Sequence, residues 1–195
     1  MRIIAGTLRG RRLLTPGSGK HNPVIRPTAD RAREALFSII GRRIDGAGVV
    51  DLFAGTGAFG LEALSRGALS VLFVDNQVGA LTLIHNNVEQ CGFSDRSLVV
   101  KRDLTKGLSF LDKLAPAQGF SLVFLDPPYG QGLALDCLHE IAAGVRLSKD
   151  NALVIAEESA KETLPDTVGS LSLNDKRHYG DTGFWFYERK ELASR

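Results

Sequence analysis

The tetrad Asp126-Pro127-Pro128-Tyr129 is the part of the sequence whose residue types most clearly predict chemistry. It follows the apolar run at residues 120–125, and its two prolines fix φ and remove two backbone donors. The Asp126 carboxylate and the Pro127 carbonyl then form a rigid edge that only accepts hydrogen bonds. Such an edge suits an exocyclic amino group, whose N–H bonds need acceptors. Tyr129 adds a face on which a planar base can stack, although a rigid turn beside a core tyrosine is the structural alternative.

A second motif, DLFAGTGAFG at residues 51–60, joins a strand-like run to a helical one. It contains G-x-G-x-x-G, which lets the backbone approach a ligand closely and can hold a dinucleotide at a helix N-terminus. Asp51, just ahead of the glycines, would repel a pyrophosphate but attract a cationic amino-acid group. The motif therefore favours a zwitterionic, sulfonium-bearing nucleoside over a dinucleotide. Asp75, twenty residues after Gly55, suits the ribose hydroxyls of either ligand.

Acidic residues recur at the ends of four successive strand-like runs. They are Asp51, within the first run, and Asp75, Asp103 and Asp126, which each close one. Ligands of open α/β sheets bind outside the carboxyl ends of the strands. A single acid at such a place can simply cap a loop, but four in succession predict an acid-lined crevice. A crevice of this kind suits a ligand with hydroxyl and amino groups.

Alternating strands and helices must position these motifs. The strand-like runs are residues 49–54, 70–75, 97–103, 120–126 and 152–158, and helical patterns lie around 58–66, 78–91, 105–114 and 131–143. Continuous apolar strands separated by helices predict a parallel sheet that is buried on both faces. Segments 171–179 and 184–190, around the turn GDTG, predict an antiparallel hairpin. The fold class is therefore α/β and Rossmann-like, with a seven-stranded, mostly parallel sheet and an antiparallel C-terminal hairpin.

The first 43 residues differ from the rest of the chain in charge. They carry ten Lys and Arg against Asp30 and Glu34, a net charge of +8, whereas residues 44–195 carry 14 basic and 20 acidic residues, a net charge of −6. We therefore predict two parts: a basic arm or hairpin with a helix at 1–43, and a ligand-binding domain at 44–195. A basic segment on an acidic body indicates a polyanion partner such as nucleic acid, the alternative being a solvated arm.

Composition excludes several classes of protein. The chain has 195 residues, of which 44% are hydrophobic and 24% charged, as is usual for a soluble globular domain. Cys91 and Cys137 form neither a disulfide framework nor a CxxC site, and the four histidines show no metal-ligand spacing, so we expect no metal. No apolar run approaches the ~20 residues of a membrane span, and the start MRIIAG lacks the core of a signal peptide. We therefore expect a cytoplasmic protein without membrane contact, and a monomer by default.

The two motifs occur together in a known group of enzymes. The turn D-L-F-A-G-x-G and the tetrad D-P-P-Y resemble the paired motifs of class I S-adenosylmethionine-dependent amino-methyltransferases. More closely, four blocks resemble the RsmD-type 16S ribosomal RNA (guanine-N2)-methyltransferases: MRIIAGTLRGRRL, RPTADRAREALFSII, DLFAGTGAFGLEALSRGA and KRHYGDTGFWFYER. The resemblance spans essentially the whole chain. Thr56 stands where Ser is expected and Asp75 where Glu is more usual, and both replacements keep the chemistry.

This resemblance implies the ligands and the reaction. The cofactor would be S-adenosylmethionine, with S-adenosylhomocysteine as its product and no metal. The partner would be 16S rRNA in the small ribosomal subunit or its assembly intermediate. The target would be the N2 amino group of one guanine, guanine 966, methylated by direct in-line transfer to a flipped base.

The resemblance also implies a role for each candidate residue. The cofactor-binding residues would be Asp51, Phe53, Gly55 and Gly57 for the methionine part, Asp75 and Asn76 for the ribose and adenine edge, and Asp103 and Leu104 beside the adenine. The catalytic residues would be Asp126, Pro127, Pro128 and Tyr129, with hydrogen bonds from the guanine amino group to Asp126 and Pro127. The RNA-binding residues would be Arg9, Arg11, Arg12, Arg26, Arg31 and Arg33.

Four other functions remain open at this point. An N6-adenine or N4-cytosine methyltransferase uses the same tetrad but normally needs a large target-recognition region. A glutamine methyltransferase acting on a protein typically has Asn in place of Asp126. An NAD-dependent dehydrogenase would share the glycine motif. A non-catalytic ribosome-assembly or RNA-binding factor would need none of the tetrad's chemistry.

Overall fold

The computed structural model describes residues 1–17, 27–148 and 152–189, with the backbone alone at 27–30. One sheet of eight strands runs through the molecule in the order β3-β2-β1-β4-β5-β8-β7-β6. The strands are β1 (Gly48–Leu52), β2 (Ser70–Asp75), β3 (Ser97–Lys101), β4 (Leu122–Leu125), β5 (Leu153–Ser159), β6 (Thr167–Val168), β7 (Leu171–Tyr179) and β8 (Thr182–Arg189). Strands β1 to β5 are parallel, and β8 is antiparallel to both of its neighbours, β5 and β7.

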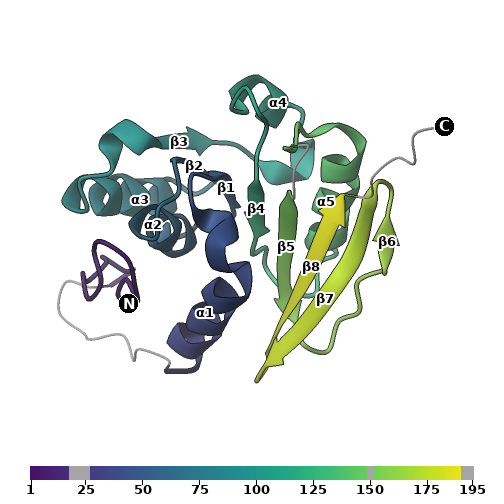
Figure 1. Ribbon diagram of the computed structural model, residues 1–195, viewed down its shortest axis with the longest axis horizontal. Coiled ribbons are helices and arrows are strands. Elements are labelled where there is room, and N and C mark those ends of the chain that lie inside the picture. Colours follow the sequence, from purple (N-terminus) through teal and green to yellow (C-terminus); the bar gives the residue numbers. More distant parts are fainter. Residues whose placement is uncertain (18–26, 149–151, 190–195) are drawn as a thin grey trace.

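The mostly parallel α/β sheet and its antiparallel C-terminal hairpin confirm the predicted fold class (Figure 1). The count of seven strands is one too low, because the two-residue strand β6 extends the sheet beyond β7. A pair of residues is too short to show the alternation by which a strand is found in a sequence.

Helices cover both faces of the sheet (Figure 1). One face packs against α1 (Pro27–Ile40), α2 (Ala58–Ser65) and α3 (Val78–Gln90), and the other against α4 (Phe110–Leu114) and α5 (Leu133–Gly144). Short 3-10 helices are η1 (Gly41–Ile44), η2 (Ser94–Arg96) and η3 (Leu104–Lys106). The helix predicted at 105–114 is thus interrupted between η3 and α4, and the N-terminal helix leaves α geometry at Gly41.

The strict alternation of side chains along a strand decides which residues share a face. Val49, Phe124 and Ile155 belong to the core beneath α1, α2 and α3, whereas Val50 and Val123 belong to the core on the α5 side. Continuing the first set by two residues reaches positions 51, 126 and 157. The sheet therefore brings three acidic positions, from three adjacent strands, to the same face at the carboxyl ends.

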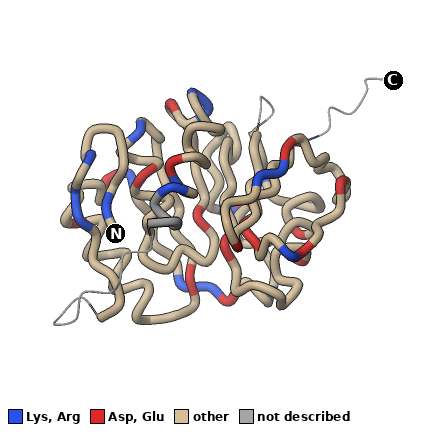
Figure 2. The backbone as a smooth tube through the Cα atoms, turned by 90° about the horizontal axis from the view of Figure 1, so that it is seen from below, with Lys and Arg blue, Asp and Glu red and all other residues tan. Residues whose placement is uncertain are grey.

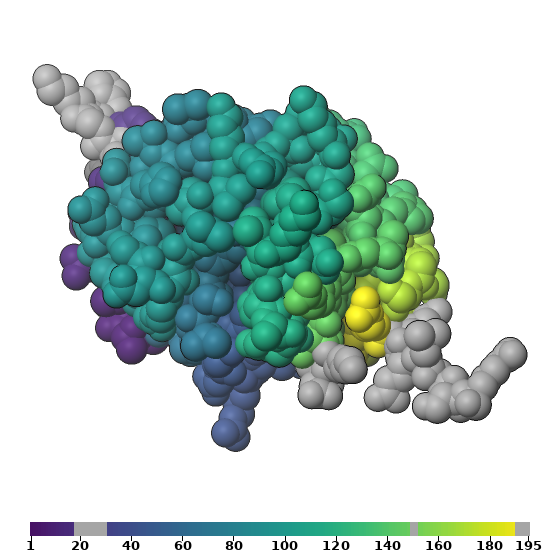
Figure 3. Space-filling model, turned by 90° about the horizontal axis from the view of Figure 1, so that it is seen from above, coloured from purple at the N-terminus to yellow at the C-terminus, as the bar shows by residue number. Residues whose placement is uncertain are grey.

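The N-terminal segment belongs to the same core as the sheet. Ile3 and Leu13 are buried in it, together with Leu36, Phe37 and Ile40 of α1. The segment closes on itself through an antiparallel bridge between residues 2 and 12. Figure 3 shows this segment at the end of the molecule away from the C-terminal hairpin. Within the described residues, the predicted basic part at 1–43 thus shares a hydrophobic core with the predicted domain at 44–195.

Candidate functional site

The site lies where the order of the strands reverses. Strand β1 has β2 on one side and β4 on the other. The connection from β1 to β2 runs through α2 on one face of the sheet, whereas the connection from β3 to β4 runs through α4 on the other face. In open α/β sheets, ligands bind at this point, outside the carboxyl ends of the strands. Asp51 pairs in register with Phe124, so that Asp126 follows two residues beyond on the adjacent strand. Acidic residues gather near the centre of the view from this end (Figure 2).

The glycine-rich turn has an unusual backbone. Phe53, Gly55 and Gly57 have φ angles of 59°, 56° and 74°, and Phe53 is the one non-glycine residue with positive φ in the described part of the chain. A left-handed conformation is unfavourable for a residue with a bulky side chain, and such residues cluster at ligand sites. The turn is therefore held in a conformation that it would not adopt alone.

Two aspartates hold this turn in place. Asp51 Oδ2 accepts a hydrogen bond from the Gly60 amide at 3.0 Å, in the first turn of α2. Asp75 Oδ2 accepts from the Gly55 amide at 2.9 Å, and its Oδ1 accepts from the Gln77 amide at 2.9 Å. The two acids predicted to contact the ligand therefore also fix the loop that would surround it.

A cavity of about 540 Å³ opens on one side of the turn. Six of the predicted cofactor-binding residues line it: Phe53, Gly55, Asp75, Asn76, Asp103 and Leu104. All four residues of the Asp-Pro-Pro-Tyr tetrad line it as well, and so do Gln77 and Arg102, which the sequence patterns do not single out. Residues spread over more than 75 positions in the sequence thus surround one space. We call it the nucleoside cavity.

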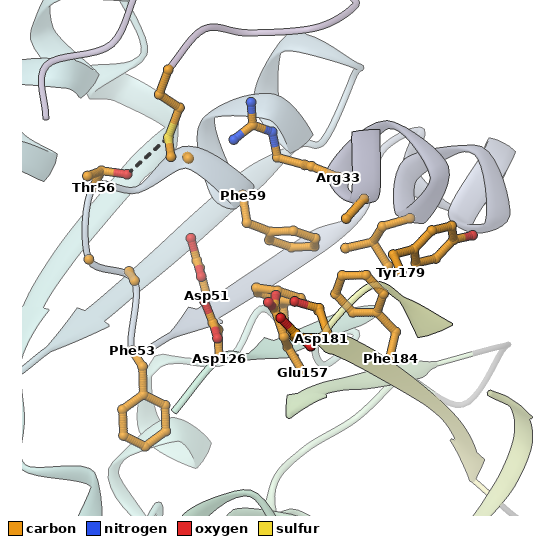
Figure 4. Close-up of a pocket in the computed structure, with 18 of the residues that line it drawn as sticks. Arg33, Asp51, Phe53, Thr56, Phe59, Asp126, Glu157, Tyr179, Asp181 and Phe184 are labelled. Carbon is orange, nitrogen blue, oxygen red and sulfur yellow. Dashed lines mark hydrogen bonds between the residues drawn. The ribbon is translucent and has the colours of Figure 1, made fainter. Parts of the chain in front are cut away.

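A second cavity, also of about 540 Å³, lies on the α1 side of the turn (Figure 4). Its walls include Asp51, the aromatic rings of Phe59, Phe124, Tyr179 and Phe184, and the turn between β7 and β8. Phe53, Gly55 and Asp126 line both cavities. We call this second space the aromatic cavity. The two spaces therefore meet at Asp126, the first residue of the tetrad.

The aromatic rings form a continuous wall. Phe59 of α2 stacks on Phe124 of β4 with 3.9 Å between ring centroids, and Phe37 of α1 stacks on Phe59 at 5.0 Å. The ring of Phe53 is directed away from this group (Figure 4). Apolar walls with a few convergent polar groups are typical of a binding site for a planar ligand.

Two aspartates of the site, Asp51 and Asp126, have raised pKa values. Burial raises the pKa of Asp51 to about 8, although the hydrogen bond from Gly60 partly opposes this, and Asp75 adds repulsion. Burial likewise raises the pKa of Asp126 well above its usual range, and the negative charges of Glu157 and Asp51 raise it further. Asp126 as a whole nevertheless remains exposed to solvent. Perturbed carboxyl groups in a cavity are typical of functional sites.

Asp103 differs from the other strand-end acids. Its Oδ1 accepts hydrogen bonds from the Thr105 amide at 3.1 Å and the Thr105 hydroxyl at 2.6 Å, and these bonds lower the pKa of Asp103. The residue lies at the start of η3, two positions after β3 ends. Gly57 does not line either cavity; it lies before α2, where a side chain would contact the ring of Phe73.

The predicted RNA-binding arginines fall into three groups. Arg9, Arg11 and Arg12 are exposed on the N-terminal segment, and basic positions follow this segment beside the N-terminus in Figure 2. Arg31 is exposed on α1, whereas Arg33 lines the aromatic cavity and its Nη2 donates to the Arg2 carbonyl at 2.7 Å. Arg26 lies outside the described residues.

Glu157 and Thr182 belong to the site but are absent from the predicted set. Tyr129 donates its hydroxyl hydrogen to Glu157 Oε1 at 2.7 Å, and its oxygen lies 3.4 Å from Thr182 Oγ1. Burial raises the pKa of Glu157, an effect that this hydrogen bond opposes. The run 152–158 ends in two glutamates, as the earlier runs end in aspartates, so the same strand-end pattern could have identified Glu157. Nothing local in the sequence marks Thr182.

The structure also bears on the expectations about metal and disulfides. In the described ranges, no three His, Cys, Asp or Glu side chains come together as a metal site would require. Cys91 and Cys137 are buried free thiols. No helix in the described part of the chain has the length and apolarity needed to span a membrane.

Comparison with known proteins places the chain in a family. The family model described as "Conserved hypothetical protein 95" matches residues 1–188. YlbH of Bacillus subtilis is 33% identical over 190 residues, which cover 97% of this chain and 100% of YlbH. "Ribosomal RNA small subunit methyltransferase D" of Escherichia coli is 32% identical, over 97% of this chain and 90% of that protein.

A solved structure extends the likeness to the fold. That of yhhF from Escherichia coli is 30% identical, with a TM-score of 0.78 over 97% of this chain and 98% of that one. Family model, relatives and structure agree over nearly the full length, and they match the predicted family. The chain therefore belongs to the Conserved hypothetical protein 95 family, which is the RsmD family.

Proposed function

We propose that the protein uses S-adenosylmethionine to methylate the N2 amino group of a guanine in 16S rRNA, guanine 966 by resemblance, in the small ribosomal subunit or its assembly intermediate. The observation that carries this proposal is the place of Asp126, where the nucleoside cavity meets the aromatic cavity. A transferase for two different ligands needs such a junction. The name of the Escherichia coli relative supports RNA of the small subunit as the substrate.

The nucleoside cavity fits an adenosine-like ligand. Asp75 and Asn76 would hold the ribose and the adenine edge, with Asp103 and Leu104 beside the adenine. Asp75 retains acceptor capacity, because a carboxylate has about four lone-pair sites and its two hydrogen bonds use two. S-adenosylmethionine, when bound, supplies an electrophilic methyl group on a positively charged sulfur.

Asp51 would bind the cationic end of this ligand, with Phe53, Gly55 and Gly57 shaping the loop around it. Of its two oxygens, Oδ2 is used by Gly60, and Oδ1 accepts no hydrogen bond from the described residues. The ionised form of a buried carboxyl group is unfavourable without a nearby cation, and the raised pKa of Asp51 reflects this cost. An ammonium group would favour the ionised form and relieve this cost.

The tetrad would prepare the nucleophile. The lone pair of a guanine amino nitrogen is delocalised into the ring, which makes the nitrogen a poor nucleophile. Hydrogen bonds to the Asp126 carboxylate and the Pro127 carbonyl, with Pro128 keeping this edge rigid, would favour a pyramidal nitrogen. Stacking on Tyr129 would orient the ring. Correct alignment of two reactants can lower a barrier by up to ~7–11 kcal/mol.

The transfer forms a bond between N2 and the methyl carbon and breaks the carbon–sulfur bond. Positive charge develops on N2, and the Asp126 carboxylate stabilises it in a site with little water. The surplus proton then leaves N2 for Asp126 or for water. Its raised pKa suits Asp126 to accept a proton from a cationic nitrogen. No covalent intermediate with the protein is needed.

The basic N-terminal part would position the RNA. Arg9, Arg11, Arg12, Arg26, Arg31 and Arg33 would contact phosphates, which orient a nucleic acid without reading its sequence. A guanine in a stacked loop must be extruded to reach the cavity, at a cost of a few kcal/mol.

Mapping of methylguanosine by mass spectrometry tests this proposal. We expect the 16S rRNA of a deletion strain to lack one N2-methylguanosine, and the purified protein to restore it on small subunits. Restoration of a methylated adenine or cytosine instead would support the N6-adenine or N4-cytosine alternative. Unchanged RNA in the deletion strain would refute the proposal and favour a non-catalytic assembly factor.

A further inference from the structure

Glu157 is an acid of the site to which the reaction above assigns no role. It lies in β5 beside β4, on the same sheet face as Asp51 and Asp126, and it lines the aromatic cavity. Oε1 accepts the hydrogen bond from Tyr129, whereas Oε2 accepts none from the described residues. Figure 4 shows its carboxylate in the same part of the cavity as that of Asp126. A free acceptor therefore lies beside the proposed amino-group site.

The polar groups around this acceptor are mostly acceptors too. Asp51, Asp126, Glu157 and Asp181 are the acids that line the aromatic cavity. Among the described lining residues, Arg33 has the one cationic side chain, and its Nη2 already donates to the carbonyl of Arg2. A base that enters this cavity therefore meets an excess of acceptors over donors.

The nucleobases differ in what they place beside their amino group. Guanine carries the N1–H donor next to the N2 amino group, so that its edge presents neighbouring donors. Adenine and cytosine carry an unprotonated ring nitrogen, an acceptor, next to theirs. An ionised carboxylate only accepts hydrogen bonds, so it binds the guanine edge and repels the other two. Sites built to bind a donor strongly reject analogues that lack it.

We propose that Glu157 selects guanine, its carboxylate accepting a hydrogen bond from N1–H while Asp126 and the Pro127 carbonyl accept from the N2 amino group. The hydrogen bond from Tyr129 holds the carboxylate in position for this contact. The inference rests on the proposed function and adds to it the residue that discriminates among bases.

The test compares two bases in the substrate. Small subunits are reconstituted with 16S rRNA that carries either guanine or 2-aminopurine at the mapped target; 2-aminopurine keeps the amino group but has an acceptor at N1. The variant is Glu157→Gln, whose amide can donate to that acceptor, and Glu89→Gln is the matched control on the exposed face of α3. Initial rates of methyl transfer and the affinity for S-adenosylhomocysteine are measured for each protein.

We expect Glu157→Gln to lower the rate on guanine by about 10- to 100-fold, the range for loss of a hydrogen bond to a charged group. The rate on 2-aminopurine should fall less or rise, so that the guanine preference drops at least about tenfold. The affinity for S-adenosylhomocysteine and the control variant should match the wild type. Tyr129→Phe, which removes the hydrogen bond that positions Glu157 but keeps its carboxylate, should lower the guanine preference less than Glu157→Gln does.

Other outcomes separate the two proposals. Equal losses on both bases would overturn the inference, since Glu157 would then only support the site, and wild-type behaviour of Glu157→Gln would overturn it as well. In both cases the proposed function would stand. Absence of transfer by the wild-type protein to either base would overturn the proposed function and, with it, this inference.

Discussion

At the scale of single residues, hydrogen bonding separates acids that look alike in the sequence. Asp75 uses both oxygens to hold the glycine turn, and Asp103 accepts hydrogen bonds from Thr105 in its own loop. Asp51 is buried and keeps one oxygen free of partners in the described structure. The carboxylate of Asp126 accepts no hydrogen bond from the described residues and lies where the two cavities meet. Among these four aspartates, Asp51 and Asp126 therefore keep carboxylate oxygens without a hydrogen-bond partner in the described structure, and under the proposed function these oxygens would bind the ligands.

Replacement of Asp51 by Asn should make ligand-free stability less dependent on pH. The folded pKa of about 8 lies above the ordinary value of 3.8, so the folded protein binds more protons between these values and its stability falls as pH rises. Asp51→Asn keeps the acceptor for the Gly60 amide but removes the carboxyl group whose ionisation lowers the stability as pH rises. We expect its melting temperature to exceed that of the wild type increasingly from pH 5 to 8, by about 2–4 °C for each kcal/mol.

Thermal melts over this pH range, with Asp95→Asn as an exposed control, measure the effect. The same variant should bind S-adenosylhomocysteine at least about tenfold more weakly, because a charge-assisted bond is lost. A parallel pH dependence in wild type and variant would show that Asp51 does not titrate in this range.

Replacement of Asp126 by Ala should greatly slow methyl transfer, while the binding of S-adenosylhomocysteine is kept. Loss of a group that stabilises developing charge typically costs about 10²- to 10³-fold in rate. Asp126 contributes one side of the nucleoside cavity, so calorimetry should find the affinity for S-adenosylhomocysteine within a few-fold of the wild type. Unchanged methyl incorporation into small-subunit RNA would remove the tetrad from the mechanism. Titration with NAD in the same calorimeter tests the dehydrogenase alternative.

At the scale of elements, α2 and α3 connect the N-terminal segment to the glycine turn. The buried Glu62 accepts from the amides of Ile4 and Ala5 at 2.6 and 2.9 Å and pairs with Arg66 Nε at 2.7 Å. Asn87 Oδ1 accepts from the Leu14 amide at 2.7 Å. These bonds hold the irregular N-terminal segment against two regular helices.

Asn87 has the central place in this connection. Its Nδ2 donates to the carbonyls of Leu14 at 3.1 Å and Thr56 at 3.0 Å. We expect Asn87→Ala to lower the free energy of unfolding by roughly 1–3 kcal/mol, because buried backbone groups lose their partners. Urea denaturation measures the change, and Asn86→Ala, exposed on the same helix, is the control. The Leu14 amide should also lose protection from hydrogen exchange; equal protection in both variants would argue against this connection.

At the scale of the whole molecule, charge is divided between two regions. Basic positions follow the N-terminal segment, and acidic positions gather near the centre of the view (Figure 2). Several of these acids line the two cavities. An acid-lined pocket repels phosphates, so a nucleic acid can deliver a neutral base to it only if cations beside the pocket hold the backbone. Under the proposed function, the basic N-terminal segment would supply such cations.

The salt dependence of RNA binding should therefore depend on this segment. The double variant Arg9→Gln and Arg12→Gln should reduce the slope of log K against log salt by about 1.4–1.8, the release expected for two phosphate contacts. The exposed pair Lys113→Gln and Lys161→Gln, on other surfaces, serves as the control. Filter binding to small-subunit RNA over a range of salt measures the slopes. Equal slopes for the two double variants would assign the segment to solubility rather than to RNA.

The order of elements and the identity of the tetrad follow from local patterns. Apolar runs, glycines and prolines restrict the backbone within a few residues, which is why seven strands and the main helices lie where the sequence places them. Such patterns do not predict strand β6 or the break between η3 and α4, because both depend on pairing and packing with other segments of the chain. The strand-end pattern marks Glu157 as a candidate, but it does not show the hydrogen bond from Tyr129, which lies 28 positions earlier in the chain.

By itself, the sequence determined the parallel α/β class, the acids at the strand ends and the acceptor edge of the tetrad, since side-chain type and backbone restriction are local properties. Only the tertiary structure decided which of those acids keep free oxygens. It also decided that two cavities meet at Asp126 and that Glu157 joins the site. The physical reason is that burial, charge repulsion and hydrogen-bond partnership arise between residues far apart in the chain, and the alternation of three adjacent strands brings them to one face.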